Sequence, residues 1–360
     1  MFWRQKRGTV FVGLSGGVDS AVSAALLKQQ GYDVIGVFIR IVLPGYPCTA
    51  GEDRREALRV ATHLHIPFRE IDLSDAYMRT VFTPSIAAFA EGKTPNPDAW
   101  CNREIKFGLF YNYAREQGAD YVATGHYARV LRTKHQFGLF ASIDTKKDQS
   151  YFLWSIPYAQ LPHILFPIGM FKKEKVRQLA KRFHLPNAAR KDSQGLCFVG
   201  DLGIEQILTK EQPQYPGKVL DEKGNEIGVH AGAMLYTIGQ RHGFTLHAHT
   251  THTQPHFVVR KDIAHNTITV SERKIPTMYS STRLILTQTN WIGNAPEEGQ
   301  YMVRFRYRQP LMPAFIHYAD DTTLVTLQQP QLVPEGQSLV VYKENQCIGG
   351  GVVDKVEMEA

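Results

Sequence analysis

The 360-residue chain contains little cysteine and no long apolar run. Its cysteines, Cys48, Cys101, Cys197 and Cys347, are widely spaced and form no C-x-x-C pair. This pattern excludes a disulfide scaffold and a cysteine-based zinc site, and it disfavours an iron–sulfur cluster. No apolar stretch is long enough to cross a bilayer, and the N-terminal segment lacks the apolar region of a signal peptide. We therefore expect a soluble, cytoplasmic protein without membrane contact.

The chain also lacks internal repeats and low-complexity tracts, and it has a moderate excess of positive charge. Lysine and arginine number 41 against 34 aspartate and glutamate residues, for a net charge of +7. This balance suits a polyanionic partner such as nucleic acid, but a mildly basic enzyme with scattered lysines would show it too. Charge alone does not separate the two.

Buried strands alternate with helices in the first half of the chain. The sequence predicts strands at 9–14, 33–40, 68–73 and 121–124 and helices at 19–30, 52–65 and 104–118. Such alternation predicts an α/β fold: a doubly wound, Rossmann-type parallel sheet with helices on both faces. The pattern changes near residue 200. Hairpin signals follow from Gly217, first in KVLDEKGNEIGVH (218–230) and then in HFVVRKDIAHNTITVSE (256–272). After about residue 275 short strands predict an all-β barrel or sandwich.

A glycine-rich turn ends the first strand. Gly16 and Gly17 let backbone N–H groups turn inward at a helix N-terminus, and Ser15 and Ser20 add hydroxyl donors, so the turn suits an anion. Asp19 would repel phosphate unless a cation such as Mg²⁺ lay between them. A Walker loop is excluded because it needs a lysine. A nucleophile elbow, which Gly13-Leu14-Ser15-Gly16-Gly17 matches, and a plain βα turn stay open.

Two cysteines lie in polar, turn-rich stretches: Cys101 in KTPNPDAWCNREIKF and Cys197 in RKDSQGLCFVG. Buried structural cysteines usually lie in apolar runs, so these two are expected to be accessible. Two thiols beside a nucleotide loop suggest sulfur transfer, in which one carries a persulfide and the other attacks it or the activated substrate. Cys347, on a predicted strand, is expected to be packed, and Cys48 to be non-catalytic.

The residues Ser15-Gly16-Gly17-Val18-Asp19-Ser20 resemble the pyrophosphate loop of the ATP pyrophosphatase superfamily. Over nearly the whole chain, further motifs resemble the bacterial single-chain tRNA-specific 2-thiouridylases (the MnmA/TrmU family). These motifs are TPNPDAWCNREIKF (94–107), ATGHYAR (123–129), KDQSYFL (147–153), KDSQGLCFVG (191–200), PGK (216–218), YTIGQRHG (236–243), RYRQ (306–309) and GGG (349–351).

The resemblance implies three domains: an ATP pyrophosphatase domain at 1–203, a small central domain that contacts tRNA at 204–274, and a C-terminal β-barrel at 275–360. It implies that ATP, with Mg²⁺, adenylates the 2-carbonyl oxygen of the wobble uridine, position 34, of tRNAs for Lys, Glu and Gln. Sulfur from an enzyme persulfide then displaces AMP. The implied sulfur source is a cysteine desulfurase or a relay protein, and the expected state is a monomer.

The resemblance also implies site residues. Cys101 would be the nucleophile, Cys197 the persulfide carrier and Asp98 the group that assists proton transfer. ATP would contact Gly13, Leu14, Ser15, Gly16, Gly17, Val18, Asp19, Ser20, Ile39 and Gly125. The tRNA would contact Asn96, Pro97, Asp98, His126, Lys147, Asp148, Gln149, Arg306, Tyr307 and Gln337. No protein-bound metal is implied, and a transient disulfide between Cys101 and Cys197 stays open.

Three features left other readings open. The stretch from Arg40 to Pro44 departs from the family pattern, which puts the Ile39 contact in doubt. The cluster His247, His249, His252 and His256 could suggest a metal, but its threonine-rich setting favours a solvated loop. Arg304, Arg306 and Arg308 alternate with aromatic residues, so on a strand they would share one face and suit phosphate.

Two other functions remained possible. A ligase-type ATP pyrophosphatase that acts on a small molecule would need neither cysteine. A catalytically dead RNA-binding protein would not need Asp19, but the unbroken loop and both cysteine motifs argue against decay.

Overall fold

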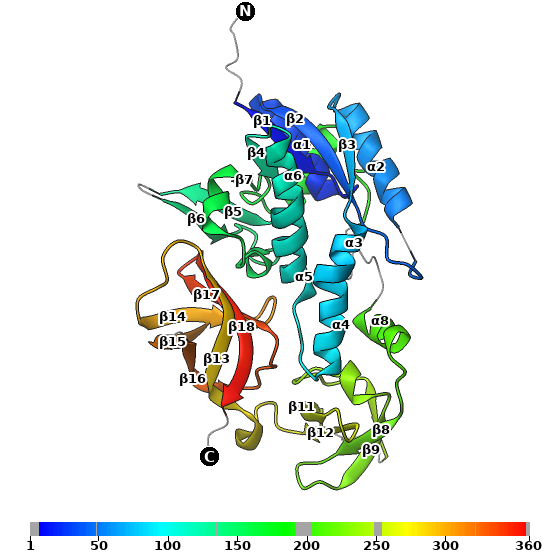
Figure 1. The fold of residues 1–360 in the computed structure, drawn as a ribbon, viewed down its shortest axis with the longest axis vertical. Coiled ribbons are helices and arrows are strands. Elements are labelled where there is room, and N and C mark those ends of the chain that lie inside the picture. The colour runs from blue at the N-terminus through cyan, green and yellow to red at the C-terminus, as the bar shows by residue number, and fades with distance from the viewer. Residues whose placement is uncertain are drawn as a thin grey trace, which may run out of the picture.

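Three sheets follow one another along the chain, as Figure 1 shows. The computed structural model describes residues 7–47, 49–133, 136–191, 203–247, 254–320 and 322–357. The N-terminal sheet stands at one end of the molecule. The barrel and the small central sheet stand at the other end, joined to it by helices. Among the described helices, none is long and apolar enough to span a membrane.

The first sheet is parallel, as predicted, with the strand order β3-β2-β1-β4-β7. Its strands are β1 (Thr9–Gly13), β2 (Asp33–Arg40), β3 (Phe68–Asp72), β4 (Tyr121–Ala123) and β7 (Ile164–Leu165). From β1 the chain moves outward to β2 and β3, and then returns to the other side of β1 to form β4. This reversal makes the sheet doubly wound and places a crevice between the carboxyl ends of β1 and β4.

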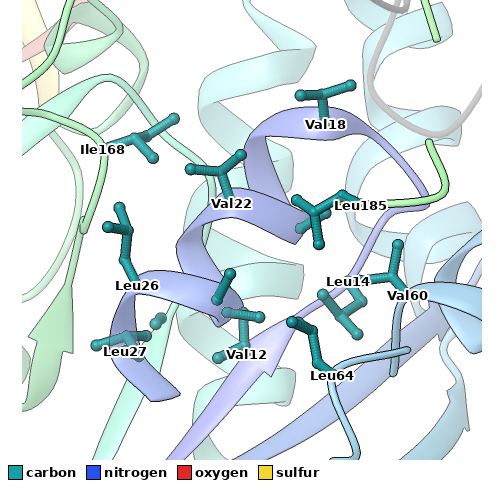
Figure 2. Close-up of a cluster of buried hydrophobic side chains, with 14 of the residues drawn as sticks. Val12, Leu14, Val18, Val22, Leu26, Leu27, Val60, Leu64, Ile168 and Leu185 are labelled. Atoms are coloured by element: carbon teal, nitrogen blue, oxygen red, sulfur yellow. The ribbon is translucent and has the colours of Figure 1, made fainter. Parts of the chain in front are cut away.

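Helices cover both faces of this sheet. The helices α1 (Val18–Gln30), α2 (Ala50–His63) and α7 (Lys173–Arg182) pack on one face, in a core that includes Val12, Val22, Leu26 and Val60 (Figure 2). Phe11, next to Val12, points into the opposite core. Successive strand residues thus face opposite layers, which explains why the centre of β1, residues 10–12, is entirely apolar and buried.

Two longer helices fill the opposite face, and each contains a π-helical turn. The first runs through α3 (Ser74–Tyr77), η1 (Met78–Phe82) and α4 (Thr83–Ala90); the second through α5 (Pro97–Trp100), η2 (Cys101–Leu109) and α6 (Phe110–Glu116). The prediction that the second helix begins at Glu104 was wrong. It begins at Pro97, because proline suits the first helical position and Asn96 caps it by accepting a hydrogen bond from the Ala99 N–H at 3.2 Å.

The central part consists of α8 (Ile204–Glu211) and a five-stranded sheet. Its strands are β8 (Gly217–Leu220), β9 (Glu226–His230), β10 (Phe244–Leu246), β11 (Phe257–Asp262) and β12 (Thr267–Ser271). The pairs β8–β9 and β11–β12 are antiparallel neighbours, so both predicted hairpins are confirmed.

The C-terminal part is a closed antiparallel barrel, as predicted. Its six strands are β13 (Ser281–Trp291), β14 (Gly299–Arg304), β15 (Met312–Ala319), β16 (Thr322–Gln331), β17 (Ser338–Lys343) and β18 (Gln346–Glu357). The order β13-β16-β15-β14-β17-β18 closes through pairing of β13 with β18. A hairpin from the first half of the chain, β5 (Ala128–Arg132) and β6 (Phe137–Ala141), adds to β18. The sequence did not reveal this hairpin.

A buried ion pair joins the barrel to the N-terminal part. The Arg304 guanidinium donates to the Asp148 carboxylate at 2.5 Å, and their side chains are 10% and 5% exposed. The expectation that Arg304, Arg306 and Arg308 share one strand face was wrong, because β14 ends at Arg304 and the next residues form a turn. Asp148 also accepts hydrogen bonds from Ser142 and Ser150 N–H groups.

Replacing Arg304 with methionine should lower the free energy of unfolding by about 3 kcal/mol, since it leaves a buried carboxylate without its cation. Urea unfolding measures the change. Lys218→Met is the matched control, because the Lys218–Glu226 pair is surface-exposed and should contribute too little to detect. Equal effects of the two substitutions would show that the Arg304–Asp148 pair does not hold the barrel in place.

Candidate functional site

The crevice at the carboxyl ends of β1 and β4 is built from two loops. One is the glycine-rich loop between β1 and α1, which begins after Gly13; the other, Thr124 to Tyr127, follows β4. In open parallel sheets, ligands bind at this kind of reversal in strand order. The topology therefore places the sequence-predicted nucleotide loop where a nucleotide would be bound.

The glycine-rich loop is folded around its own serines. Gly16 has a φ of +76°, and Gly17 caps the N-terminus of α1. The Ser20 hydroxyl accepts a hydrogen bond from the Ser15 N–H at 3.2 Å and donates to the Gly17 carbonyl at 3.1 Å. The start of a 13-residue helix thus stands behind the loop, and its partial positive charge favours an anion there.

Gly125 lets the second loop touch the first. A Cβ atom at Gly125 would lie 2.7 Å from the Ser20 backbone nitrogen and 2.8 Å from the Asp19 carbonyl carbon, so any side chain would push the loops apart. The backbone of Gly125 thus lies directly against the glycine-rich loop, which is called the phosphate loop below. Three other residues predicted to contact ATP, Leu14, Val18 and Ile39, are instead buried in the core. Ile39 lies on β2, and its side chain packs in an apolar cluster.

Asp19 already faces a cation supplied by the protein. The Lys173 ammonium lies 2.8 and 2.9 Å from the two carboxylate oxygens, and the Tyr127 hydroxyl donates to the same carboxylate at 3.0 Å. Sequence reasoning invoked Mg²⁺ here and missed Lys173, which begins α7 far along the chain. No local signal separates Lys173 from its neighbour Lys172.

Two further residues that the sequence did not single out orient the loop. The Asn187 side-chain amide donates to the Gly16 carbonyl at 2.8 Å, and the Arg190 guanidinium donates to it at 3.1 Å. Asp53 fixes Arg190 at 2.5 Å. Because a peptide unit is planar and trans, holding the Gly16 carbonyl on one side turns the Gly17 N–H to the other. These contacts prevent a flip that would present an oxygen to an anion.

The segment with the first cysteine begins at a rigid turn. The Asn96 side chain caps α5 and donates to the Ser338 hydroxyl of the barrel at 3.2 Å, so Pro97 and Asp98 start a helix of fixed position. Cys101 begins the π-helical segment η2 and is fully buried in an apolar cluster. The expectation that Cys101 is accessible was therefore wrong for this structure, since the polar turn ends before it and its helix faces the core.

His126 links the helix of Cys101 to the loop after β4. Its ring lies 3.4 Å from the Lys106 ammonium on η2 and 2.7 Å from the Thr124 hydroxyl. Burial, and then the charge of Lys106, hold the His126 pKa well below its usual value. Because an ammonium can only donate, Nε2 must accept from Lys106 and Nδ1 must carry the proton toward Thr124.

Most residues that were predicted to contact tRNA form contacts with other protein residues in this structure. Asp148 is buried against Arg304, and the Gln149 side chain accepts from the Tyr127 N–H at 2.9 Å. Lys147 is partly buried beside them. Gln149 thus supports the loop after β4 through Tyr127, and contact of these three residues with RNA stays a prediction.

The barrel residues that were predicted to contact tRNA lie in two separate places. Gln337 accepts from the Tyr151 hydroxyl at 3.0 Å and lies beside Pro95, so it adjoins the Asn96 turn. Arg306 instead donates to the Ile238 carbonyl of the central part at 2.7 Å, and Tyr307 packs on the Phe152 ring, with centroids 4.7 Å apart.

Several predictions lie outside the described residues: the role of Cys197, the setting of Cys48, and half of the histidine cluster, His249 and His252. Of the remaining histidines, His247 lies 3.8 Å from Glu226, and His256 lies 3.7 Å from Glu272. Cys347 is buried on β18, as predicted, and burial raises its pKa to about 12.

Three family models match the chain in succession. The model described as tRNA methyl transferase HUP domain matches residues 8–201, and the tRNA methyl transferase PRC-barrel domain matches 205–272. The aminomethyltransferase beta-barrel domain matches 281–353.

Curated relatives match over almost the whole length. The tRNA-specific 2-thiouridylase MnmA of Geobacillus thermodenitrificans is 40% identical over 354 residues, which are 96% of this chain and 95% of the relative. The protein of that name from Lacticaseibacillus paracasei is 41% identical over 353 residues, 96% and 94% of the two chains. Among solved structures, a 4-thiouridine synthetase in complex with RNA and ATP aligns with a TM-score of 0.37 at 20% identity, covering 57% of this chain and 50% of that one.

The geometry around His126 predicts that its ring stays neutral, with the proton on Nδ1, at pH values well below 6.5. The unfolded chain binds a proton at that ring more readily, so His126 should lower stability as the pH falls below 6.5. Nitrogen-15 NMR of the imidazole reports the tautomer and its titration. A His126 ring that gains a second proton near pH 6.5, the usual value for a histidine pKa, would contradict the assignment.

Proposed function

The chain belongs to the family of tRNA-specific 2-thiouridylases, tRNA sulfurtransferases, and we propose that it uses ATP to convert the wobble uridine, position 34, of tRNA to 2-thiouridine. The observation that carries this proposal is a continuous path of contacts. Lys106, on the helix of Cys101, reaches His126, and the adjacent Gly125 lies against Asp19 and Ser20 of the phosphate loop. A base held at Asp98 and Cys101 and a nucleotide held at the loop would thus share one crevice.

In the first step, the uridine O2 attacks the α-phosphate of ATP and pyrophosphate leaves. The loop from Ser15 to Ser20 supports this step, because its N–H groups and the α1 dipole stabilise the charge on the departing pyrophosphate. Asn187 and Arg190 hold the Gly16 carbonyl turned away from that charge. Asp19 and Lys173 supply a carboxylate that would hold Mg²⁺ with the nucleotide and an ammonium for the phosphates.

In the second step, the terminal sulfur of a persulfide on Cys197 attacks C2 of the adenylated base, and AMP leaves with the former carbonyl oxygen. The Cys101 thiolate then attacks the Cys197 sulfur, which breaks the persulfide bond and leaves the sulfur on the base. The product is a Cys101–Cys197 disulfide that an external thiol must reduce. Asp98, at the start of α5, assists the proton transfers.

Transfer from Cys197 requires that Cys101, fully buried in this structure, become exposed when substrate binds. We propose that the sulfur comes from a cysteine desulfurase directly or through a relay protein. We also propose that the substrates are tRNAs for Lys, Glu and Gln, and that the enzyme is a cytoplasmic monomer.

Mass spectrometry of digested tRNA tests the proposal, after incubation with Mg²⁺-ATP and a persulfide donor. Wild-type protein should form 2-thiouridine and AMP, and Cys101→Ser and Cys197→Ser should form no 2-thiouridine. Lys173→Met should reduce AMP formation by roughly 10²-fold, the loss expected when a group that stabilises developing charge is removed.

Cys347→Ala is the matched control, because Cys347 is a buried cysteine packed where the barrel meets the N-terminal part, and it should retain activity. AMP without thiouridine from wild-type protein would redirect the proposal to a ligase-type reaction on another acceptor. Bound tRNA with neither product would favour RNA binding alone.

A further inference from the structure

A cavity of about 380 Å³ lies beside the Asn96 turn, where the N-terminal part meets the central part. Its walls come from α4, the turn from Thr94 to Pro97, α8, and the segment 235–242 of the central part. The crevice described above does not include it. A volume of this size lies within the range of small-molecule and cofactor sites and greatly exceeds what one water needs.

The interior of the cavity is mainly apolar. Phe89, Leu208, Leu235 and the two prolines of the turn provide hydrophobic lining. Thr94 also lines it; this residue is only 7% exposed, and its hydroxyl oxygen has no hydrogen-bond partner. Such a buried, unsatisfied hydroxyl costs free energy unless a ligand group comes to meet it.

Polar side chains complete the lining. Glu205 offers a carboxylate and His242 an imidazole. The Gln240 amide is held in place, since its oxygen accepts from the Thr237 N–H at 3.1 Å and its nitrogen donates to the His242 carbonyl at 2.9 Å. Apolar faces with hydrogen-bonding groups at the edge suit a flat heterocycle, whose ring surface is apolar and whose edge carries donors and acceptors.

The cavity is rigidly placed beside the proposed target site. The Thr94 N–H donates to the Glu335 carbonyl of the barrel at 2.7 Å, and Asn96 is fixed to Ser338. Pro97, a wall residue, directly precedes Asp98. A group in the cavity would therefore be one short step along an RNA chain from a base at Asp98.

We propose that this cavity binds a second nucleobase of the substrate RNA, the one next to the extruded uridine. The proposal rests on the proposed function. Extruding one base from a loop removes a stacking surface from its neighbours, and such unstacked bases are taken up on protein side chains. The cavity supplies that surface and reads the edge of the neighbouring base through Glu205, Gln240 and His242.

Equilibrium binding of tRNA tests this, with the cavity filled from two different elements by Thr237→Trp or Glu205→Trp. Each substitution should weaken binding of intact tRNA by roughly 10-fold or more, the loss of one stacked base. An abasic nucleotide at position 33 or at position 35 should weaken wild-type binding by a similar factor. Filled cavity and abasic RNA together should cause no further loss, because both remove the same interaction.

Thr62→Trp is the matched control, since Thr62 lines a separate 370 Å³ depression on α2 and should leave binding unchanged. Normal binding of intact tRNA by both filled variants would overturn the proposal. So would affinity losses that multiply when a filled variant is combined with abasic RNA. So would filled variants that bind tRNA normally but no longer accept sulfur from a protein donor, which would assign the cavity to that donor. If wild-type protein binds tRNA without thiolating it, the proposed function fails, while the binding comparison still decides the role of the cavity.

Discussion

The close contact between Gly125 and the backbone of Asp19 and Ser20 is the constraint on which the site depends. It holds the loop after β4 against the start of α1, with no room for a side chain between them. His126 follows directly and reaches Lys106 on the cysteine helix. The glycine-rich loop and the helix of Cys101 are thereby fixed relative to each other by the sheet itself, through a glycine and a neutral, buried histidine.

The turn from Thr94 to Pro97 is held between the barrel and the central part. The residues from Thr94 to Pro97 contact the barrel through Glu335, Gln337 and Ser338, and they line a cavity shared with α8 and the central part. The barrel is in turn fixed by the Arg304–Asp148 pair and by strand pairing of β6 with β18. A barrel remote in sequence thus helps to position the residues that precede Cys101.

The parts of the fold with local signals were predictable, and the parts that depend on distant contacts were not. The β1 loop, the end of α1 at Gly31 and both central hairpins follow from hydrophobic period and glycine placement. Lys173, Asn187 and Arg190 could not be found this way, because their roles exist only once the chain brings them to the phosphate loop. Cys101 was expected to be exposed because its neighbours in sequence are polar, whereas the helix turns it into the core.

Adenylation of the base followed by displacement of AMP is the central chemical claim, and oxygen transfer tests it most directly. We would supply tRNA labelled with oxygen-18 at O2 of the wobble uridine and analyse the AMP released. Attack of O2 on the α-phosphate predicts AMP that carries one oxygen-18 atom for each 2-thiouridine formed. Unlabelled AMP alongside 2-thiouridine would contradict the mechanism, because the carbonyl oxygen would then leave the base by a route that does not pass through an adenylate.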